Sequence, residues 1–222
     1  MITTAHIASI PSRQESLRQC VRSIYNQVDK VYVMLNGYSE VPSFLRELPK
    51  VQAEVLDNSL GDAARYSHFG EDDGYSFFCD DDLIYSRNYC QYLIYKYNQH
   101  KGCLVTLHGK VYHRPIISAH RGIKENYRCL GTVQGDHIVD TGGTGVMLIK
   151  TGDLKISLDD FKKPNMADIW IAKLSHEQNV KIVVVEHKAG IVKYMPQTET
   201  IWRSFTKDDD VYQTKVLKHF LE

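Results

Sequence analysis

Three consecutive carboxylates, Asp80-Asp81-Asp82, are the residues of this sequence best suited to do chemistry. They follow the hydrophobic run 75–79, and no cationic residue lies next to them in the chain. Like charges this close repel one another unless something stabilises them. Hard carboxylate oxygens suit Mg²⁺ or Mn²⁺, and the open positions of such a metal can take diphosphate oxygens. The triad therefore predicts a divalent-cation site in which the metal acts as a Lewis acid on a diphosphate.

The three aspartates need not have the same role. Alternate residues at a strand end point the same way, so Asp80 and Asp82 are expected to share a face. We expect Asp82 to bind the metal, Asp80 to bind the metal or a ribose, and Asp81 to belong to the nucleotide site. The alternative is a solvated acidic turn in which Asp82 caps a following helix. An EF-hand calcium loop is disfavoured because its glycine and its spaced ligands are missing.

Strand-like and helix-like patterns alternate through the first hundred residues. The predicted strands cover 2–10, 30–35, 51–56, 74–79 and 103–107, and the predicted helices cover 14–27 and 86–99. Ser12 is expected to cap the first helix, with Glu15 completing a capping box. The alternation predicts βαβ units and one α/β domain, with a Rossmann-like, mostly parallel sheet flanked by helices.

The second half of the chain is less regular. Residues 108–139 are polar and rich in His and Arg, which predicts a long loop or short hairpins over the sheet. A glycine turn at 142–145 precedes a predicted strand at 146–149. A helix at 167–178, a strand at 181–185 and an amphipathic segment at 211–221 follow. No internal repeat or linker is present, which supports a single domain.

Ligands of open parallel sheets bind at the carboxyl ends of the strands, so the loops after 9, 36, 56 and 79 are expected to meet. Backbone groups and a helix N-terminus in the first loop suit a base or a phosphate. Asp62 is expected to accept from a uracil N–H, and Arg65 to face a carbonyl or phosphate oxygen. The alternatives are a helix N-cap for Asp62 and a surface cation for Arg65. The predicted nucleotide site comprises Ser9, Ile10, Pro11, Arg13, Asn36, Asp62, Arg65, Asp80 and Asp81.

Composition limits the partners and the compartment. Lys plus Arg equals Asp plus Glu at 27 each, so the 222-residue chain has no general attraction for nucleic acid or anionic membranes. Five cysteines at wide spacings, without a CxxC pair, predict free thiols in a reducing compartment. No run of about 18 apolar residues is present, and the N-terminus lacks a basic leader. We therefore expect a cytoplasmic protein whose contact with a membrane is at most peripheral.

The order of a strand, a P-x-R loop, a strand ending in Asn36 and an acidic triad after a hydrophobic strand resembles the GT-A-fold glycosyltransferases. In more detail, most of the chain resembles the N-acetylglucosaminyl transferase subunit of bacterial heparosan capsule synthesis. This resemblance rests on Gln27-Val28-Asp29-Lys30, Leu35-Asn36, Asp80 to Tyr85, His108-Gly109, Gly143-Thr144-Gly145, Asp168, and Trp202 with Phe205-Thr206-Lys207.

The resemblance implies a metal-dependent enzyme, with Mn²⁺ or Mg²⁺, that transfers N-acetylglucosamine from UDP-GlcNAc to a glucuronic acid end of a growing bacterial surface polysaccharide. It implies a nucleotide-sugar-binding half at 1–107 and, at 108–222, an acceptor half with a C-terminal lid. The segment 112–137 departs from the family, and Arg65 stands where the family has Lys. The acceptor and the stereochemical outcome therefore stay open, as does association with the inner face of a membrane or with a polymerase complex.

The resemblance also assigns roles in the second half. Gly143, Thr144 and Gly145, with His108, would form the wall around donor sugar and acceptor; a satisfied polar histidine is the alternative for His108. Asp168 would be the catalytic carboxylate, as a general base in an inverting enzyme or as an orienting group in a retaining one. Its alternative is a carboxylate that stabilises the helix dipole.

The last assigned residues lie near the C-terminus. His187 would be a third metal ligand, as a late histidine is in many GT-A enzymes. Trp202 and Arg203, with Lys207, would close over the site and exclude water, or would form a plain packing segment. Two other functions stay open. A nucleotidyltransferase is disfavoured because the loop 9–13 lacks glycine, and a nucleotide-sugar-binding protein without transferase activity is disfavoured by the intact triad.

Overall fold

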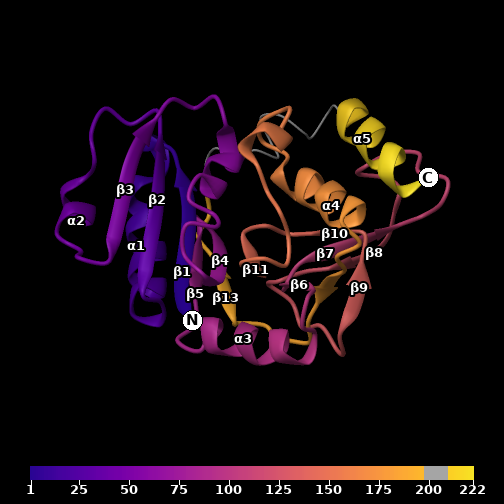
Figure 1. The fold of residues 1–222 in the computed structure, drawn as a ribbon, viewed down its shortest axis with the longest axis horizontal. Helices are drawn as coiled ribbons and strands as arrows, with labels where there is room; N and C mark the ends of the chain where they lie inside the picture. The colour runs from indigo at the N-terminus through magenta and orange to yellow at the C-terminus, as the bar shows by residue number, and fades with distance from the viewer. Residues whose placement is uncertain (198–209) are drawn as a thin grey trace.

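A computed structural model describes residues 1–197 and 210–222 of the chain (Figure 1). Its centre is an eight-stranded sheet with the order β3-β2-β1-β4-β11-β6-β12-β9. The strands of this sheet are β1 (Ile2–Ser9), β2 (Lys30–Asn36), β3 (Val51–Leu56), β4 (Gly74–Asp80), β6 (Leu104–Thr106), β9 (His137–Val139), β11 (Val146–Lys150) and β12 (Ile182–Val184). Each strand predicted from the sequence is present, with bounds shifted by one or two residues at most.

The first half of the sheet is parallel, as predicted. Strand β1 pairs in parallel with β2 and β4, and β2 pairs in parallel with β3. Nearly continuous burial along β1, β2 and β4 matches the apolar runs of the sequence. Strand β11 then runs antiparallel between β4 and β6, and β9 adds an antiparallel edge. The sheet is therefore mixed but mostly parallel.

Helices cover both faces of the sheet (Figure 1). Apolar residues of α1 (Gln14–Ile24) and α3 (Tyr89–Gln99) share one core cluster with Phe77 of β4. Residues of η3 (Gly61–Tyr66), α4 (Ala167–Glu177) and α5 (Val211–Leu221) share the other cluster with Phe78. The alternation of side chains along β4 thus feeds two cores. A single domain with flanking helices is confirmed.

Two small sheets complete the fold. The first has the order β10-β7-β8 and contains β7 (Gly109–Tyr112), β8 (Ile123–Tyr127) and β10 (Thr141–Gly142). It realises the short hairpin expected within 108–139. The second pairs β5 (Leu83–Tyr85) with β13 (Val192–Tyr194), and neither strand is predicted from the sequence. Because β5 follows the acidic triad directly, Asp82 caps no helix, and α3 begins only at Tyr89.

The start of α1 differs from the prediction. A 3-10 turn, η1 (Pro11–Arg13), precedes the helix, and the N-cap of α1 is Arg13, without a side-chain hydrogen bond. The expected capping box of Ser12 and Glu15 is therefore wrong. Proline favours the first position of a helical turn, so Pro11 begins the turn before Ser12 can act as a cap. The hydroxyl of Ser16 donates instead to the carbonyl oxygen of Arg13 at 2.9 Å.

Four shorter helical turns connect these elements: η2 (Tyr25–Gln27), α2 (Ser43–Arg46), η4 (Leu158–Asp160) and η3. All five cysteines are free, as predicted. Within the ranges 1–197 and 210–222, none of the helices has the length and apolar character needed to cross a membrane.

Candidate functional site

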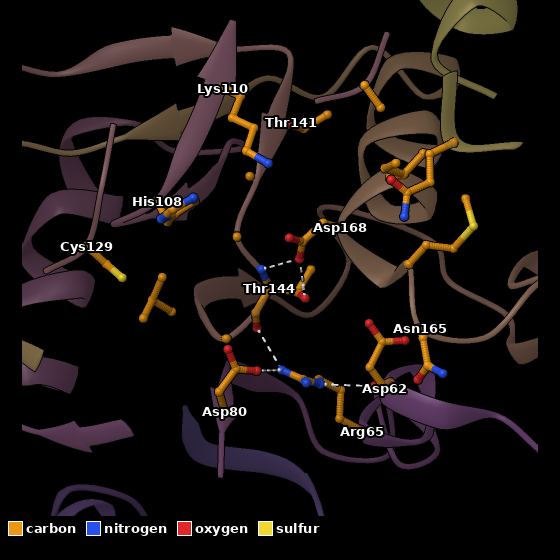
Figure 2. Close-up of a pocket in the computed structure, with 18 of the residues that line it drawn as sticks. Asp62, Arg65, Asp80, His108, Lys110, Cys129, Thr141, Thr144, Asn165 and Asp168 are labelled. Carbon is orange, nitrogen blue, oxygen red and sulfur yellow. Dashed lines mark hydrogen bonds and ion pairs between the residues drawn. The ribbon is translucent and has the colours of Figure 1, made fainter. Parts of the chain in front are cut away.

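A cavity of about 320 Å³ opens at the carboxyl end of β4, between η3, the small sheet β10-β7-β8 and the first turn of α4. Figure 2 shows side chains from each of these elements around the same space. The cavity brings together eight of the residues predicted from the sequence, namely Asp62, Arg65, Asp80, His108, Gly143, Thr144, Gly145 and Asp168. These residues therefore lie around one cavity at the sheet edge where the strand-end rule predicts ligands, and their roles stay predictions.

Other predicted residues lie outside the lining of this cavity. They are Ser9, Ile10, Pro11 and Arg13 after β1, Asn36 at the end of β2, Asp81, Asp82 and His187. Ser9 is buried next to Leu35 in the sheet register, and the assignment of these strand-end residues to a nucleotide stays a prediction. Trp202, Arg203 and Lys207 fall outside the described residues.

Two arginines from distant segments accompany the acidic triad, although no cationic residue lies next to it in the chain. Arg13 Nη1 lies 2.7 Å from Asp81 Oδ1 and 3.4 Å from Asp82 Oδ2. Arg65 Nη1 lies 2.7 Å from Asp80 Oδ1. The sequence could not show these pairs because parallel pairing of β1 with β4, which places Ala8 beside Asp80, brings distant segments together.

The three carboxylates differ in their surroundings. Asp81 is 3% exposed and faces Arg13, and burial raises its pKa above the usual range while Arg13 opposes that effect. Burial and the charges of Asp80 and Asp81 raise the pKa of Asp82 to about 7. Asp80 is the most accessible, with a side chain that is 40% exposed.

The chemistry of Asp80 and Asp82 fits a divalent cation. Three carboxylates face two guanidinium groups here, and burial together with the charges of Asp80 and Asp81 disfavours the ionised form of Asp82 in the absence of a further cation. Mg²⁺ and related ions are held in many sites by one or two carboxylates together with phosphate oxygens of the substrate. Over the ranges 1–197 and 210–222, no group of three or more His, Cys, Asp or Glu side chains is arranged to hold a metal. A metal here would therefore complete its shell from a bound substrate.

His187 is not placed as a metal ligand. It is buried, with Nδ1 2.7 Å from the carbonyl oxygen of Val185 and Nε2 3.3 Å from that of Arg128. Its backbone pairs with Val133 as an isolated bridge. Both ring nitrogens thus face protein carbonyls, and the geometry gives the predicted metal role no support. The residue is a buried histidine whose ring lies between backbone carbonyls of two separate segments.

Arg65 is bound by the protein rather than left open to a ligand. Its side chain is 6% exposed, and Nη1 donates to Asp80 Oδ1, to the Cys79 carbonyl at 3.4 Å and to the Thr144 carbonyl at 3.3 Å. Its Nε donates to the Asp62 carbonyl at 3.0 Å. The alternative of a surface cation is wrong because η3 buries this side chain. Arg65 joins the end of β4 to the glycine turn.

Asp62 and Asn36 also make contacts within the protein. Asp62 Oδ2 accepts a hydrogen bond from Ala167 N at 3.0 Å, so it satisfies the N-terminus of α4, a helix far away in the sequence. Burial raises the pKa of Asp62 to about 6. Asn36 Nδ2 donates to the Gly61 carbonyl at 2.8 Å. The remaining oxygen of each side chain, Oδ1, has no hydrogen-bond partner among the described residues.

Asp168 lies in the first turn of α4, exposed at the cavity (Figure 2). Its Oδ1 accepts hydrogen bonds from the Thr144 backbone N–H at 2.8 Å and from the Thr144 hydroxyl at 2.6 Å. The position of Asp168 in the first turn also suits stabilisation of the helix dipole. This is compatible with the hydrogen bonds that the side chain accepts from Thr144.

The opposite wall of the cavity carries His108 and Lys110. Burial lowers the pKa of His108, and the charge of Asp168 only partly opposes this effect, so the site favours the neutral ring. Lys110 points into the cavity, and its ammonium makes no ion pair within the described part of the chain (Figure 2). The sequence analysis did not identify Lys110. The available signal was alternation along β7, since Lys110 and Tyr112 both line the cavity.

The glycine turn between β10 and β11 is shaped by close contacts. A Cβ at Gly143 would lie 2.8 Å from the Cβ of His108, and a Cβ at Gly145 would lie 1.8 Å from Asp80 Oδ2. Neither position has room for a side chain unless its neighbour moves. The predicted wall residues therefore act by leaving space for His108 and Asp80.

Comparison with known proteins reveals the fold. No protein-family model matches the sequence, and no curated protein is significantly similar to it. Among solved structures, S. aureus TarS 1-349 in complex with UDP-GlcNAc matches with a TM-score of 0.63 and 12% identity, over 100% of this chain and 72% of that chain. GalNAc-T7 with UDP, GalNAc and Mn²⁺ matches with a TM-score of 0.63 and 9% identity, over 90% of this chain and 44% of that chain. The chain has the GT-A fold of these glycosyltransferases.

Proposed function

We propose that this protein is a metal-dependent glycosyltransferase that uses a UDP-sugar donor. The observation that carries the proposal is that Asp80, at the end of β4, and Asp168, at the start of α4, line one cavity. Arg65 and Thr144 connect the two carboxylates through hydrogen bonds. An acidic strand end beside a second carboxylate suits transfer chemistry, because one group can serve the donor and the other the acceptor.

On the donor side, Asp80 and Asp82 would hold Mn²⁺ or Mg²⁺. Such a metal supplies charge stabilisation to the leaving nucleoside diphosphate. The residues around the ends of β1 and β2, with the Oδ1 atoms of Asn36 and Asp62 that have no partner in the described part of the chain, would meet the nucleoside. UDP-GlcNAc is our first choice of donor. The ligands named for the two similar structures, UDP-GlcNAc in one and UDP, GalNAc and Mn²⁺ in the other, support a UDP-linked N-acetylhexosamine.

On the acceptor side, the acceptor would bind between Asp168 and the wall that carries His108 and Lys110. Asp168 would deprotonate the acceptor hydroxyl in an inverting reaction, or orient it in a retaining one. The ammonium of Lys110, which has no ion-pair partner among the described residues, supports an acceptor with a negative charge, which agrees with the uronic acid end implied by the heparosan resemblance. A growing bacterial surface polysaccharide, extended in the cytoplasm or at the inner face of the membrane, is the acceptor that we propose.

Calorimetry with UDP in the presence and absence of Mn²⁺ tests the donor site. We expect UDP to bind at least about tenfold tighter with the metal, because the metal links the diphosphate to Asp80 and Asp82. The variant Asp82→Asn should lose this metal dependence while its circular dichroism and melting temperature stay those of the wild type. Asp159→Asn, which changes an exposed turn, is the matched control.

Two outcomes would contradict the proposal. One is UDP binding that is equally tight with and without metal, and the other is near-normal turnover by Asp82→Asn. Sugar identity requires a separate screen, in which UDP release is measured from UDP-GlcNAc, UDP-glucose, UDP-galactose and UDP-GalNAc. A protein that binds UDP-sugars but releases UDP from none of them, with any acceptor, would instead be a nucleotide-sugar-binding protein.

A further inference from the structure

Thr144 is the residue that holds the side chain of Asp168. Two donors of Thr144, the backbone N–H and the hydroxyl, bond to the same oxygen, Oδ1, at 2.8 and 2.6 Å. No other residue in the described part of the chain donates a hydrogen bond to this carboxylate. An exposed aspartate in the first turn of a helix otherwise samples several rotamers. The two bonds select one rotamer and leave Oδ2 free at the cavity (Figure 2).

Thr144 is itself fixed by the surrounding structure. It is 3% exposed, and its carbonyl oxygen accepts a hydrogen bond from Arg65 Nη1 at 3.3 Å. The next carbonyl, that of Gly145, accepts from the hydroxyl of the buried Tyr85 at 2.6 Å. On its other side, Gly143 packs against His108. The hydroxyl that reaches Asp168 therefore comes from a rigid turn rather than from a mobile loop.

We propose that Thr144 is a positioning residue, which acts on the transfer reaction through Asp168 by fixing where Oδ2 meets the reacting hydroxyl or sugar. The inference rests on the proposed function, in which Asp168 acts at the reaction centre. Displacement of a catalytic group by about 1 Å can reduce a rate by roughly 100-fold, so loss of one of the two bonds has a measurable effect.

A pair of conservative variants separates the hydroxyl bond from the shape of the side chain. Thr144→Val keeps the shape and the backbone bond but removes the hydroxyl, whereas Thr144→Ser keeps the hydroxyl. With UDP release from UDP-GlcNAc as the assay, we expect kcat of Thr144→Val to fall roughly 10- to 100-fold, with KM within about twofold of the wild type. Thr144→Ser should stay within about threefold of the wild-type kcat. A wild-type kcat for Thr144→Val would overturn the proposal.

Two further comparisons exclude a merely structural effect. Thr4→Val removes the hydroxyl of another buried threonine, which does not line the cavity, and should leave kcat unchanged. In an Asp168→Asn background, Thr144→Val should cause little further loss, because residues that act as a unit are not additive. If Thr144→Val lowers kcat by the same factor in the Asp168→Asn background as in the wild type, Thr144 acts independently of Asp168. That result would refute the proposal.

Crystal structures of the wild type and of Thr144→Val provide a test of the proposal that does not depend on enzyme activity. In the variant, the Asp168 side chain should adopt another rotamer or several. An unchanged Asp168 would overturn the positioning role even in a protein that never releases UDP. Conversely, a wild type that neither binds UDP nor releases it would refute the proposed function, while the rotamer comparison would still test the role of Thr144.

Discussion

At the scale of single residues, charge balance decides how the acidic triad behaves. Three carboxylates, Asp80 to Asp82, meet two guanidinium groups, those of Arg13 and Arg65. Each arginine offsets part of the negative charge of the triad. The carboxylates whose charge is not fully offset are those that would bind a metal. The triad is therefore a cluster in which two arginines pair with three carboxylates rather than a set of bare anions.

Gly145 has no side chain, and this leaves the space that the Asp80 carboxylate occupies. A methyl group there would lie 1.8 Å from Asp80 Oδ2 and 2.0 Å from its Cγ, so Gly145→Ala must displace that carboxylate. Because a partly exposed carboxylate can swing away, we expect a loss of about 1 kcal/mol or less in the free energy of unfolding. Metal-dependent UDP binding, measured by calorimetry, should weaken more than about tenfold.

Gly131→Ala is the control for this substitution. Its new methyl group would make an ordinary contact, 3.4 Å from the Arg128 carbonyl oxygen. UDP binding should be unaffected in this variant. Equal UDP affinity in the two alanine variants would mean that the position of Asp80 does not matter for the donor.

At the scale of elements, the short strand β5 holds the site together although the sequence gives no sign of it. It follows the triad directly and places Tyr85 next to the last residue of β4 and the residue before the start of β11. The buried Tyr85 hydroxyl accepts from Asp80 N at 2.8 Å and donates to the Gly145 carbonyl at 2.6 Å. One phenol thus joins the two strands at the point where the candidate site begins.

Removal of that hydroxyl should destabilise the protein. In Tyr85→Phe, the Asp80 N–H and the Gly145 carbonyl keep their mutual hydrogen bond at 3.3 Å, and loss of the two bonds to the phenol, at about 0.5–1.5 kcal/mol each, costs about 1–3 kcal/mol. Urea unfolding monitored by circular dichroism measures this change, and metal-dependent UDP binding should weaken in parallel. Tyr95→Phe, at a 58% exposed position on α3, should stay within about 0.5 kcal/mol of the wild type. Equal stabilities of the two variants would refute the bridging role.

At the scale of the whole molecule, a buried histidine links stability to pH. His6 is 1% exposed and stacks between Tyr32 and Phe78, with ring centroids 5.1 Å away on each side. Burial, with help from His68 and Lys30 and against Asp72, lowers its pKa to about 3. The native state therefore keeps this ring neutral, whereas the unfolded chain binds a proton near the usual pKa of about 6.5.

The sign of the effect follows from proton binding. Between pH 6.5 and 3 the unfolded state holds more protons at this site than the native state, so stability falls as the pH falls. From pH 7.5 to 5.0 the loss from His6 is about 2 kcal/mol. Urea unfolding at the two pH values should show this drop in the wild type, and a drop smaller by about that amount in His6→Gln. An identical pH dependence of the two proteins would show that His6 has the same pKa in the native and unfolded states.

Local pattern determined much of this molecule. Apolar runs and helical spacing predicted the parallel strands β1 to β4, the helices α1, α3, α4 and α5, and the edge of the sheet at which polar residues meet. These features are legible because burial imposes a periodicity on each element separately. The meeting of Asp62, Arg65 and Asp80 was predicted from strand order, since the carboxyl ends of parallel strands lie together, whereas the place of Asp168 was implied by the family resemblance.

Tertiary structure decided what distant segments do to one another. The pairing of Arg13 and Arg65 with the triad, the antiparallel insertion of β11, the burial of His187 and the capping of α4 by Asp62 all join residues that no local pattern relates. Strands of three residues, such as β5 and β13, are too short to carry a periodicity. The sequence therefore determined where the carboxylates meet, and only the fold determined which cations and hydrogen-bond donors hold them, because those contacts depend on side-chain reach across the sheet.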